Sequence, residues 1–179
     1  MKFHIIDGSL RQFHLTNDDI LHYHLALNIS VRNSNKMERI SYHNIHSEIY
    51  SYGKTLALVP LTSFRQGTKN TTLLYPVFQG QTLLKLDGSH LNDFNNDQRD
   101  GNYSIYVYLY VTSRLTHVGG GKSGNSYFII KQDRCGLFRL PLLDSSSSSF
   151  NNQTGIRGLF RTKRCTLYAD RDDIDYNHY

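Results

Sequence analysis

Residues 21–31, LHYHLALNISV, decide the fold class of this chain. Apolar side chains occupy every second position, and mostly polar side chains lie between them. This period of two is typical of a β-strand with one face on a core and the other in water. We therefore expect a long strand here, and its apolar positions are Leu21, Tyr23, Leu25, Leu27, Ile29 and Val31.

Residues 103–111, YSIYVYLYV, alternate in the same way but carry large side chains on both faces. Aliphatic residues form one face and tyrosines form the other, so both faces can be covered by neighbouring layers. The pattern predicts a central strand. Its aliphatic positions are Ile105, Val107, Leu109 and Val111, and its tyrosines are Tyr106, Tyr108 and Tyr110.

The rest of the chain also favours strands. Strands are predicted over residues 40–42, 45–49, 55–61, 71–78 and, after a glycine-rich turn at 119–124, over 127–131. One short helix is predicted over residues 89–97, with Ser89 as its cap. Strands that recur without helices between them predict an all-β fold, namely a Greek-key antiparallel β-sandwich of the immunoglobulin or fibronectin III kind.

Composition limits the class of protein. The chain has 179 residues, of which 39% are hydrophobic and 20% are charged, so it is too apolar for intrinsic disorder. No run of apolar residues is long enough to cross a bilayer, and the N-terminus lacks a secretory signal, which taken alone predicts a cytosolic protein. We expect one domain over residues 1–169, with a serine-rich loop at 144–153, and a polar tail over 170–179.

The charge balance permits weak attraction to anionic surfaces. Lys and Arg number 20 and Asp and Glu number 15, which gives a net charge of +5. The basic residues are scattered along the sequence and are not interleaved with stacking aromatics, which argues against nucleic-acid binding.

Three local patterns resemble catalytic or metal-binding motifs, and each has a simpler interpretation. The first pattern is a group of four histidines that could bind zinc. No Cys or carboxylate partner lies at metal-site spacing from them, so they are expected to face solvent. Residues 116–123, THVGGGKS, lack the first glycine of a phosphate loop and fit a hairpin tip. The histidines are His22, His24, His43 and His46, and a third pattern, a cation site in the tail, would need Asp170, Asp172, Asp173 and Asp175. Because no nucleophile with a nearby base can be identified, we expect a protein without catalytic activity, cofactor or metal.

Sequons and cysteines carry more specific information. Four asparagines lie in N-x-S/T sequons and are candidate glycosylation sites: Asn28, Asn70, Asn102 and Asn152. The two cysteines, Cys135 and Cys165, flank the serine loop and form either a disulfide or a pair of reduced buried thiols. Glycosylation and oxidation need the same compartment, so the two signals support each other.

Several segments together resemble the type 2 late embryogenesis abundant domain, and most of all the plant non-race-specific disease resistance and harpin-induced-like proteins. The similarity covers residues 3–142 and extends more weakly to Cys165. The segments that carry it are residues 21–56, 64–72 (FRQGTKNTT), 80–81, 6–10 (IDGSL) with Phe13, and Cys135 before 140–142.

The resemblance implies a Greek-key sandwich of about seven strands with a short helix. In that branch of the family a transmembrane helix precedes a domain that faces the apoplast, and members are associated with the plasma membrane, defence and stress responses. Asn28 and Asn70 match glycosylated positions, and Cys135 and Cys165 match the late cysteines. The family's Asn-Pro-Asn turn is Asn33-Ser34-Asn35 here, so the fixed φ of proline is lost but asparagine can still bond its own backbone.

Three hypotheses about function follow. The first is a non-catalytic plasma-membrane domain facing the apoplast, which acts in defence and meets acidic polysaccharide, lipid head groups or other defence proteins. The second is a soluble cytoplasmic protein that protects the cell during drying. The third is carriage of a hydrophobic ligand between the sheets, in a pocket lined from Leu25, Leu27, Ile105 and Val107.

Overall fold

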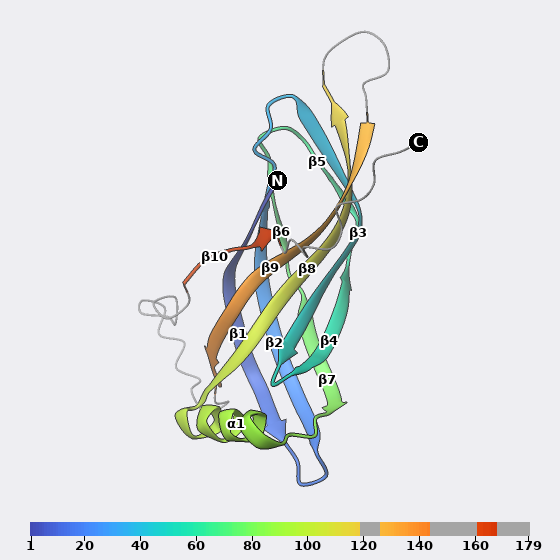
Figure 1. Cartoon of the computed structure of the whole chain (residues 1–179). Coiled ribbons are helices and arrows are strands. Elements are labelled where there is room, and N and C mark those ends of the chain that lie inside the picture. The colour runs from blue at the N-terminus through green and yellow to red at the C-terminus, as the bar shows by residue number, and fades with distance from the viewer. Residues whose placement is uncertain (119–125, 144–160, 168–179) are drawn as a thin grey trace.

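The computed structural model describes residues 1–118, 126–143 and 161–167, which form two antiparallel sheets packed face to face with a helix across one end (Figure 1). The predicted antiparallel sandwich is confirmed, and the described ranges hold eleven strands rather than about seven. The elements are β1 (Lys2–Leu15), β2 (Ile20–Arg32), β3 (Glu38–Ser51), β4 (Lys54–Leu61), β5 (Phe64–Gln66), β6 (Thr71–Leu74), β7 (Val77–Leu83), α1 (Gly88–Asp100), β8 (Asn102–His117), β9 (Ser126–Pro141), β10 (Lys163–Arg164) and β11 (Thr166–Leu167).

The chain passes between the two sheets several times. We call sheet A the order β10-β1-β2, with β6 and β7 both paired to the far edge of β2. Sheet B has the order β11-β9-β8-β3, with β4 and β5 both paired to the far edge of β3. After β4 and β5 the chain returns to sheet A for β6 and β7, and then re-enters sheet B at β8, beside β3. Such crossings between sheets are the connections of a Greek-key sandwich.

The alternating segments pack as their sequences predict. In β2 each odd position from Leu21 to Val31 is buried, whereas each even position is half-buried on the outer face. In β8 the aliphatic positions point inward and meet those of β2 in a single apolar core. The central place of β8 is confirmed, because β8 lies between β3 and β9. The hypothesis of ligand carriage needs a pocket lined by four residues that are instead packed in this core. Leu25, Leu27, Ile105 and Val107 are at most 1% exposed.

Bulges explain where the strand boundaries differ from the predicted ones. The two segments expected on either side of Asn44 are one strand, β3, with a register shift between Tyr42 and Asn44. The first strand, β1, has shifts after Ile5 and Leu10, which break its alternation and hide it from a search for period two. Conversely, Pro76 divides the expected strand 71–78 into β6 and β7 because proline has no amide proton for a ladder.

The helix is longer than predicted and begins differently. It spans Gly88–Asp100, and its N-cap is Asp87, whose side chain makes no capping hydrogen bond, rather than Ser89. Gly101 ends it with a φ of 65°, in the left-handed region where glycine is favoured. At 13 residues and mostly polar, α1 falls short of a bilayer crossing, and no other helix occurs in the described ranges. The serine-rich loop and the polar tail lie outside the described residues.

The turn at Asn33-Ser34-Asn35 holds its shape through side chains. Asn33 is fully buried, and its Oδ1 accepts the Asn35 amide at 3.0 Å. Its Nδ2 donates to the carbonyls of Glu38 at 2.8 Å and Gly67 at 2.9 Å. The asparagine therefore replaces the constraint that proline would supply, as the sequence indicates.

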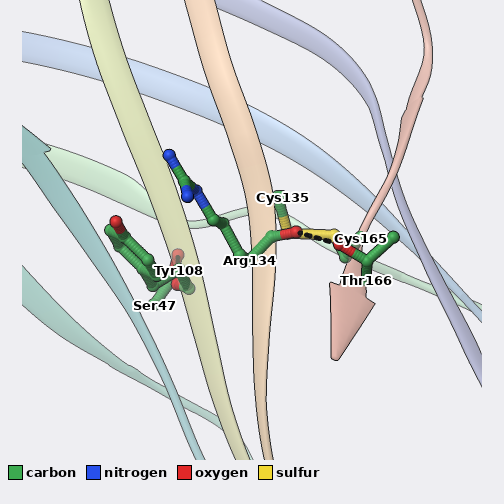
Figure 2. Close-up of a disulfide and its surroundings, with 6 residues drawn as sticks. All are labelled: Ser47, Tyr108, Arg134, Cys135, Cys165 and Thr166. Atoms are coloured by element: carbon green, nitrogen blue, oxygen red, sulfur yellow. Dashed lines mark hydrogen bonds between the residues drawn. A yellow bond between two sulfur atoms is a disulfide. The ribbon is translucent and has the colours of Figure 1, made fainter. Parts of the chain in front are cut away.

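One short C-terminal segment connects the two sheets. Lys163 and Arg164 pair with β1 of sheet A, whereas Thr166 pairs with β9 of sheet B. Between them, Cys165 donates its amide to the Phe3 carbonyl at 2.9 Å and forms a disulfide with Cys135 (Figure 2). The segment thus closes one side of the sandwich, and the disulfide fixes it there. We call residues 163–167, together with this disulfide, the clamp.

Asp97 joins the helix to the sandwich. Its carboxylate is buried and accepts the Tyr52 hydroxyl at 2.9 Å and the Ser104 amide at 3.0 Å. Arg139 donates to it at 3.3 Å but is itself well exposed. Burial and this carboxylate raise the pKa of Tyr52 well above its ordinary value of 10.0. Beside this network, Phe94 of α1 packs on the rings of Phe13, Tyr52 and Tyr103.

Replacing Cys135 and Cys165 together by serine should lower the free energy of unfolding. The disulfide closes a loop of 30 residues, for which the chain-entropy model gives about 3.5 kcal/mol. Urea unfolding of the variant and of the reduced native chain should shift by similar amounts. A loss below about 1 kcal/mol would contradict the assigned role of the clamp.

Replacing Asp97 by alanine should cost about 2 kcal/mol, because it leaves the Tyr52 hydroxyl and the Ser104 amide without the carboxylate oxygen that accepts both. Arg139→Gln is the matched control, since it removes only the exposed partner, and should cost less than about 1 kcal/mol. Equal losses of unfolding free energy in the two variants would show that Asp97 acts mainly through the ion pair.

Candidate binding face

The tyrosines of β8 and β3 lie together on the outer side of sheet B. We call this surface the tyrosine face, and it is made by His46 and Tyr50 of β3 and by Tyr106, Tyr108 and Tyr110 of β8. All five side chains are half-buried. Among the described residues no element forms a third layer on this side, and the half-burial of the tyrosines comes with ring contacts to their neighbours on the sheet.

Strand register places the side chains of this surface in rows. His46 is opposite Tyr110, Glu48 is opposite Tyr108 and Tyr50 is opposite Tyr106. Residues directly opposite in an antiparallel pair point to the same side of the sheet. Each row continues onto β4 on one side and onto β9 on the other, where Leu58 pairs with Glu48 and Arg134 pairs with Tyr108.

The rings within the tyrosine face support one another. His46 stacks on Tyr110 with ring centroids 4.6 Å apart and planes 15° apart. The Tyr50 ring meets Tyr106 edge-on at 6.2 Å and Tyr108 edge-on at 6.5 Å. Edge-to-face and offset pairs of this kind fix ring positions and contribute about 0.5–1.5 kcal/mol each. The surface is therefore built before any ligand arrives.

Glu48 lies at the centre of this surface. Its carboxylate accepts the Tyr110 hydroxyl at 2.7 Å and the Thr55 hydroxyl at 2.5 Å. Burial, followed by the hydrogen bond to Glu48 and its negative charge, raises the pKa of Tyr110 to about 12. Tyr110 consequently remains a neutral hydroxyl at physiological pH.

Arg134 supplies a positive charge at the edge of the face. Its guanidinium carbon lies 5.1 Å from the centroid of the Tyr106 ring, a cation–π distance. Figure 2 shows the Arg134 side chain extending from β9 over β8, while Cys135 beside it turns toward Cys165. The side chain is exposed, so its charge remains accessible from solvent.

A bulge in β9 lies at Arg134 and Cys135, whose side chains point in different directions. Val107 is opposite Gly136 and Tyr108 is opposite Arg134, so Cys135 is the extra residue. Gly136 has a φ of 92°, which side chains with a Cβ rarely adopt. The bulge thus directs the thiol to the clamp and the guanidinium to the tyrosine face.

The same outer side of sheet B becomes basic toward the β2–β3 end. Further along β8 from the tyrosines, Arg114 is opposite Ser41, which is in turn opposite Arg65 of β5. Arg39 lies two residues before Ser41 on β3. These three arginines are exposed. The face therefore combines aromatic rings at one end with positive charge at the other, and such a surface can bind a ligand.

The candidate glycosylation sites are spread over the molecule. Asn28 is half-buried on the outer face of sheet A, opposite Asp7. Asn70 is exposed before β6, and its Oδ1 accepts the Thr71 amide at 2.7 Å. Asn102 is half-buried at the start of β8 and donates to the Asp100 carbonyl at 3.0 Å. Asn152 lies outside the described residues, so the use of all four sequons stays a prediction.

The candidate metal and phosphate motifs do not gather into a site. His22 and His24 belong to sheet A, whereas His43 and His46 belong to sheet B, and His46 stacks on Tyr110. No group of three or more potential metal ligands occurs within the described part of the chain. The glycine-rich segment from 119 and the four tail aspartates from 170 lie outside it. A small cleft of about 220 Å³ beside the clamp is lined by Lys2, Asp133 and Arg164 among others, and by none of the residues named for ligand carriage.

The tyrosine face was missed because alternation alone does not say what lies above a strand. The tyrosines at 106, 108 and 110 were identified as one face, but the pairing of that face with Tyr50 and Arg134 needs the register of three strands. The only local signal was the absence of any further apolar segment able to cover so many tyrosines.

Comparisons with known proteins show that the chain is similar to plant proteins. It is 37% identical over 152 residues to NDR1/HIN1-like protein 10 of Arabidopsis thaliana, a match that covers 83% of this chain and 64% of that protein. NDR1/HIN1-like protein 3 of the same plant is 31% identical, with 84% of this chain and 63% of that protein covered. The chain thus spans less than two thirds of the length of these relatives. No protein-family model matches the sequence.

Solved structures resemble the chain only distantly. A protein from Arabidopsis thaliana solved in solution shares 16% identity, with 80% of this chain and 84% of that chain covered and a TM-score of 0.36. A putative late embryogenesis abundant protein shares 15% identity, with 76% and 72% covered and a TM-score of 0.25. The fold description therefore rests on the chain's own two sheets.

Glu48→Gln should lower the pKa of Tyr110 toward 10.0, because it removes the negative charge that opposes ionisation. Since the folded state raises this pKa, Tyr110 contributes stability that is fully present below pH 10 and is lost as the pH rises through about 12. Ultraviolet difference titration of tyrosine ionisation measures the change. The exposed Asp93→Asn variant is the control, and an unchanged high-pH step in Glu48→Gln would contradict the assignment.

Proposed function

Because the chain is a homologue of NDR1/HIN1-like proteins, we propose that it forms a non-catalytic binding domain at the plant plasma membrane, facing the apoplast, and acts in defence and stress responses. The observation that carries the family role is the 37% identity to NDR1/HIN1-like protein 10 over 83% of this chain. The domain would work by contact through its surface, and the tyrosine face is the surface best built for it.

Two features support an exterior location. The Cys135–Cys165 disulfide bonds the C-terminal segment to β9, and disulfides persist in oxidising compartments. The exposed sequon at Asn70 offers a site for a glycan in the same compartment. A soluble protein that protects the cell during drying would instead keep both thiols reduced in the cytosol.

The test uses the full gene product in plant cells. Thiol alkylation before and after reduction should show that Cys135 and Cys165 are oxidised, and glycosidase treatment should shift the apparent mass. Asn70→Gln should remove a glycan increment, whereas Asn17→Gln, an exposed asparagine outside any sequon, should not. Surface labelling with an impermeant reagent should reach the protein. Reduced thiols, no glycan and no surface labelling would support the soluble protective role instead.

A further inference from the structure

We propose that the tyrosine face, together with the arginines beside it, binds acidic polysaccharide, a linear chain of uronic acid sugars. This inference rests on the proposed function, because such polymers lie outside the plasma membrane. It assigns the ligand to Tyr50, Tyr106, Tyr108 and Arg134, with the basic end of the same face as a continuation. The occupant follows from the shape, the charge and the direction of this surface.

The shape suits a sugar ring. A pyranose has faces of C–H groups whose slightly positive hydrogens are attracted to the negative face of an aromatic ring. The tyrosines along β8 are half-buried and are held by Tyr50, so stacking a sugar on them orders few additional side chains. Around the rings, the Tyr110 hydroxyl oxygen, whose proton is donated to Glu48, and the Glu48 carboxylate can accept hydrogen bonds from sugar hydroxyls.

The charge favours an acidic sugar over a neutral one. Arg134 lies 5.1 Å from the Tyr106 ring, so it can meet the carboxylate of a uronate whose ring stacks beside it. Glu48 is the one carboxylate in the rows of the tyrosine face, and its charge is already engaged by two hydroxyl donors. The attraction should weaken as salt screens it.

The direction of the face favours a linear polymer. Tyr106, Tyr108 and Tyr110 follow one another along the outer side of β8, and Arg114 lies further along the same side. The eight residue steps from Tyr106 to Arg114 span about 27 Å at the usual rise of a strand. A chain that stacks on the tyrosines thus runs toward the exposed Arg65 and Arg39. A bilayer, by contrast, would need several protruding apolar side chains, and Leu58 is the one large aliphatic side chain exposed among the described residues of these rows.

The test measures binding of the full chain to a de-esterified oligogalacturonate by isothermal titration. Because the chain has 13 tyrosines and no tryptophan, tyrosine fluorescence gives a second readout. Tyr106→Ala should weaken binding about tenfold, and Tyr106→Phe, which keeps the ring, should stay within about twofold. Arg134→Gln should weaken binding about fivefold and reduce its dependence on salt.

Matched controls separate ring stacking from charge. The methyl-esterified oligomer keeps the rings but loses the carboxylates, so it should bind more weakly and equally well to the native chain and to Arg134→Gln. Tyr75→Ala and Arg11→Gln replace an exposed tyrosine and an exposed arginine away from sheet B, and should bind like the native chain. Thermal unfolding of each variant should confirm that it is folded.

Two results would overturn the inference. One is native affinity for oligogalacturonate in folded Tyr106→Ala and Tyr108→Ala variants. The other is tighter binding to phosphatidylserine vesicles that these variants do not change, which would assign the basic residues to a membrane. Either result would leave the oxidised cysteines, the glycan and the surface labelling intact, so failure of this inference is distinct from failure of the proposed cell-surface role.

Discussion

The burial of alternate aliphatic side chains between two sheets is the constraint on which the rest of this structure depends. A strand has only two sides, and the side chains on one side of β2 and of β8 are buried in a common apolar core. The residues that alternate with the buried ones must then point outward. The tyrosines of β8 lie outside because Ile105, Val107 and Leu109 lie inside, so the candidate binding face is the reverse side of the core rather than a cleft cut into it.

This geometry supports the binding role that we propose. The four residues considered for ligand carriage are sealed in the interior, and the polar groups of the tyrosine face bond one another around Glu48. A flat, prearranged surface of rings and charges is adapted to contact with something extended. Homology to NDR1/HIN1-like proteins fits a role in contact, and a sandwich closed by a disulfide-held segment can present such a surface while remaining rigid.

Much of the fold could be predicted from the sequence where alternation is uninterrupted. Residues 21–31 and 103–111 identify the class, the core and the central strand because local pattern and tertiary burial agree there. Prediction failed where the backbone departs from regular pleating: β1 carries two bulges, and Pro76 splits a strand. The tyrosine face could not be predicted for another reason. Which strand lies beside which is decided by contacts between residues far apart in the chain, such as Tyr50 with Tyr106, and no local spacing encodes these.

The single additional residue in β9 has a consequence for how the sequence can change. Before the bulge the odd position Asp133 points inward, and after it the even positions Phe138 and Leu140 do. Deleting Cys135 would restore regular alternation without turning either half of the strand over, because Asp133, Gly136 and Phe138 would still lie opposite inward-facing residues of β8. What the additional residue supplies is the inward position from which Cys135 reaches Cys165, so a relative without this disulfide could lose the residue and keep both faces of β9 as they are.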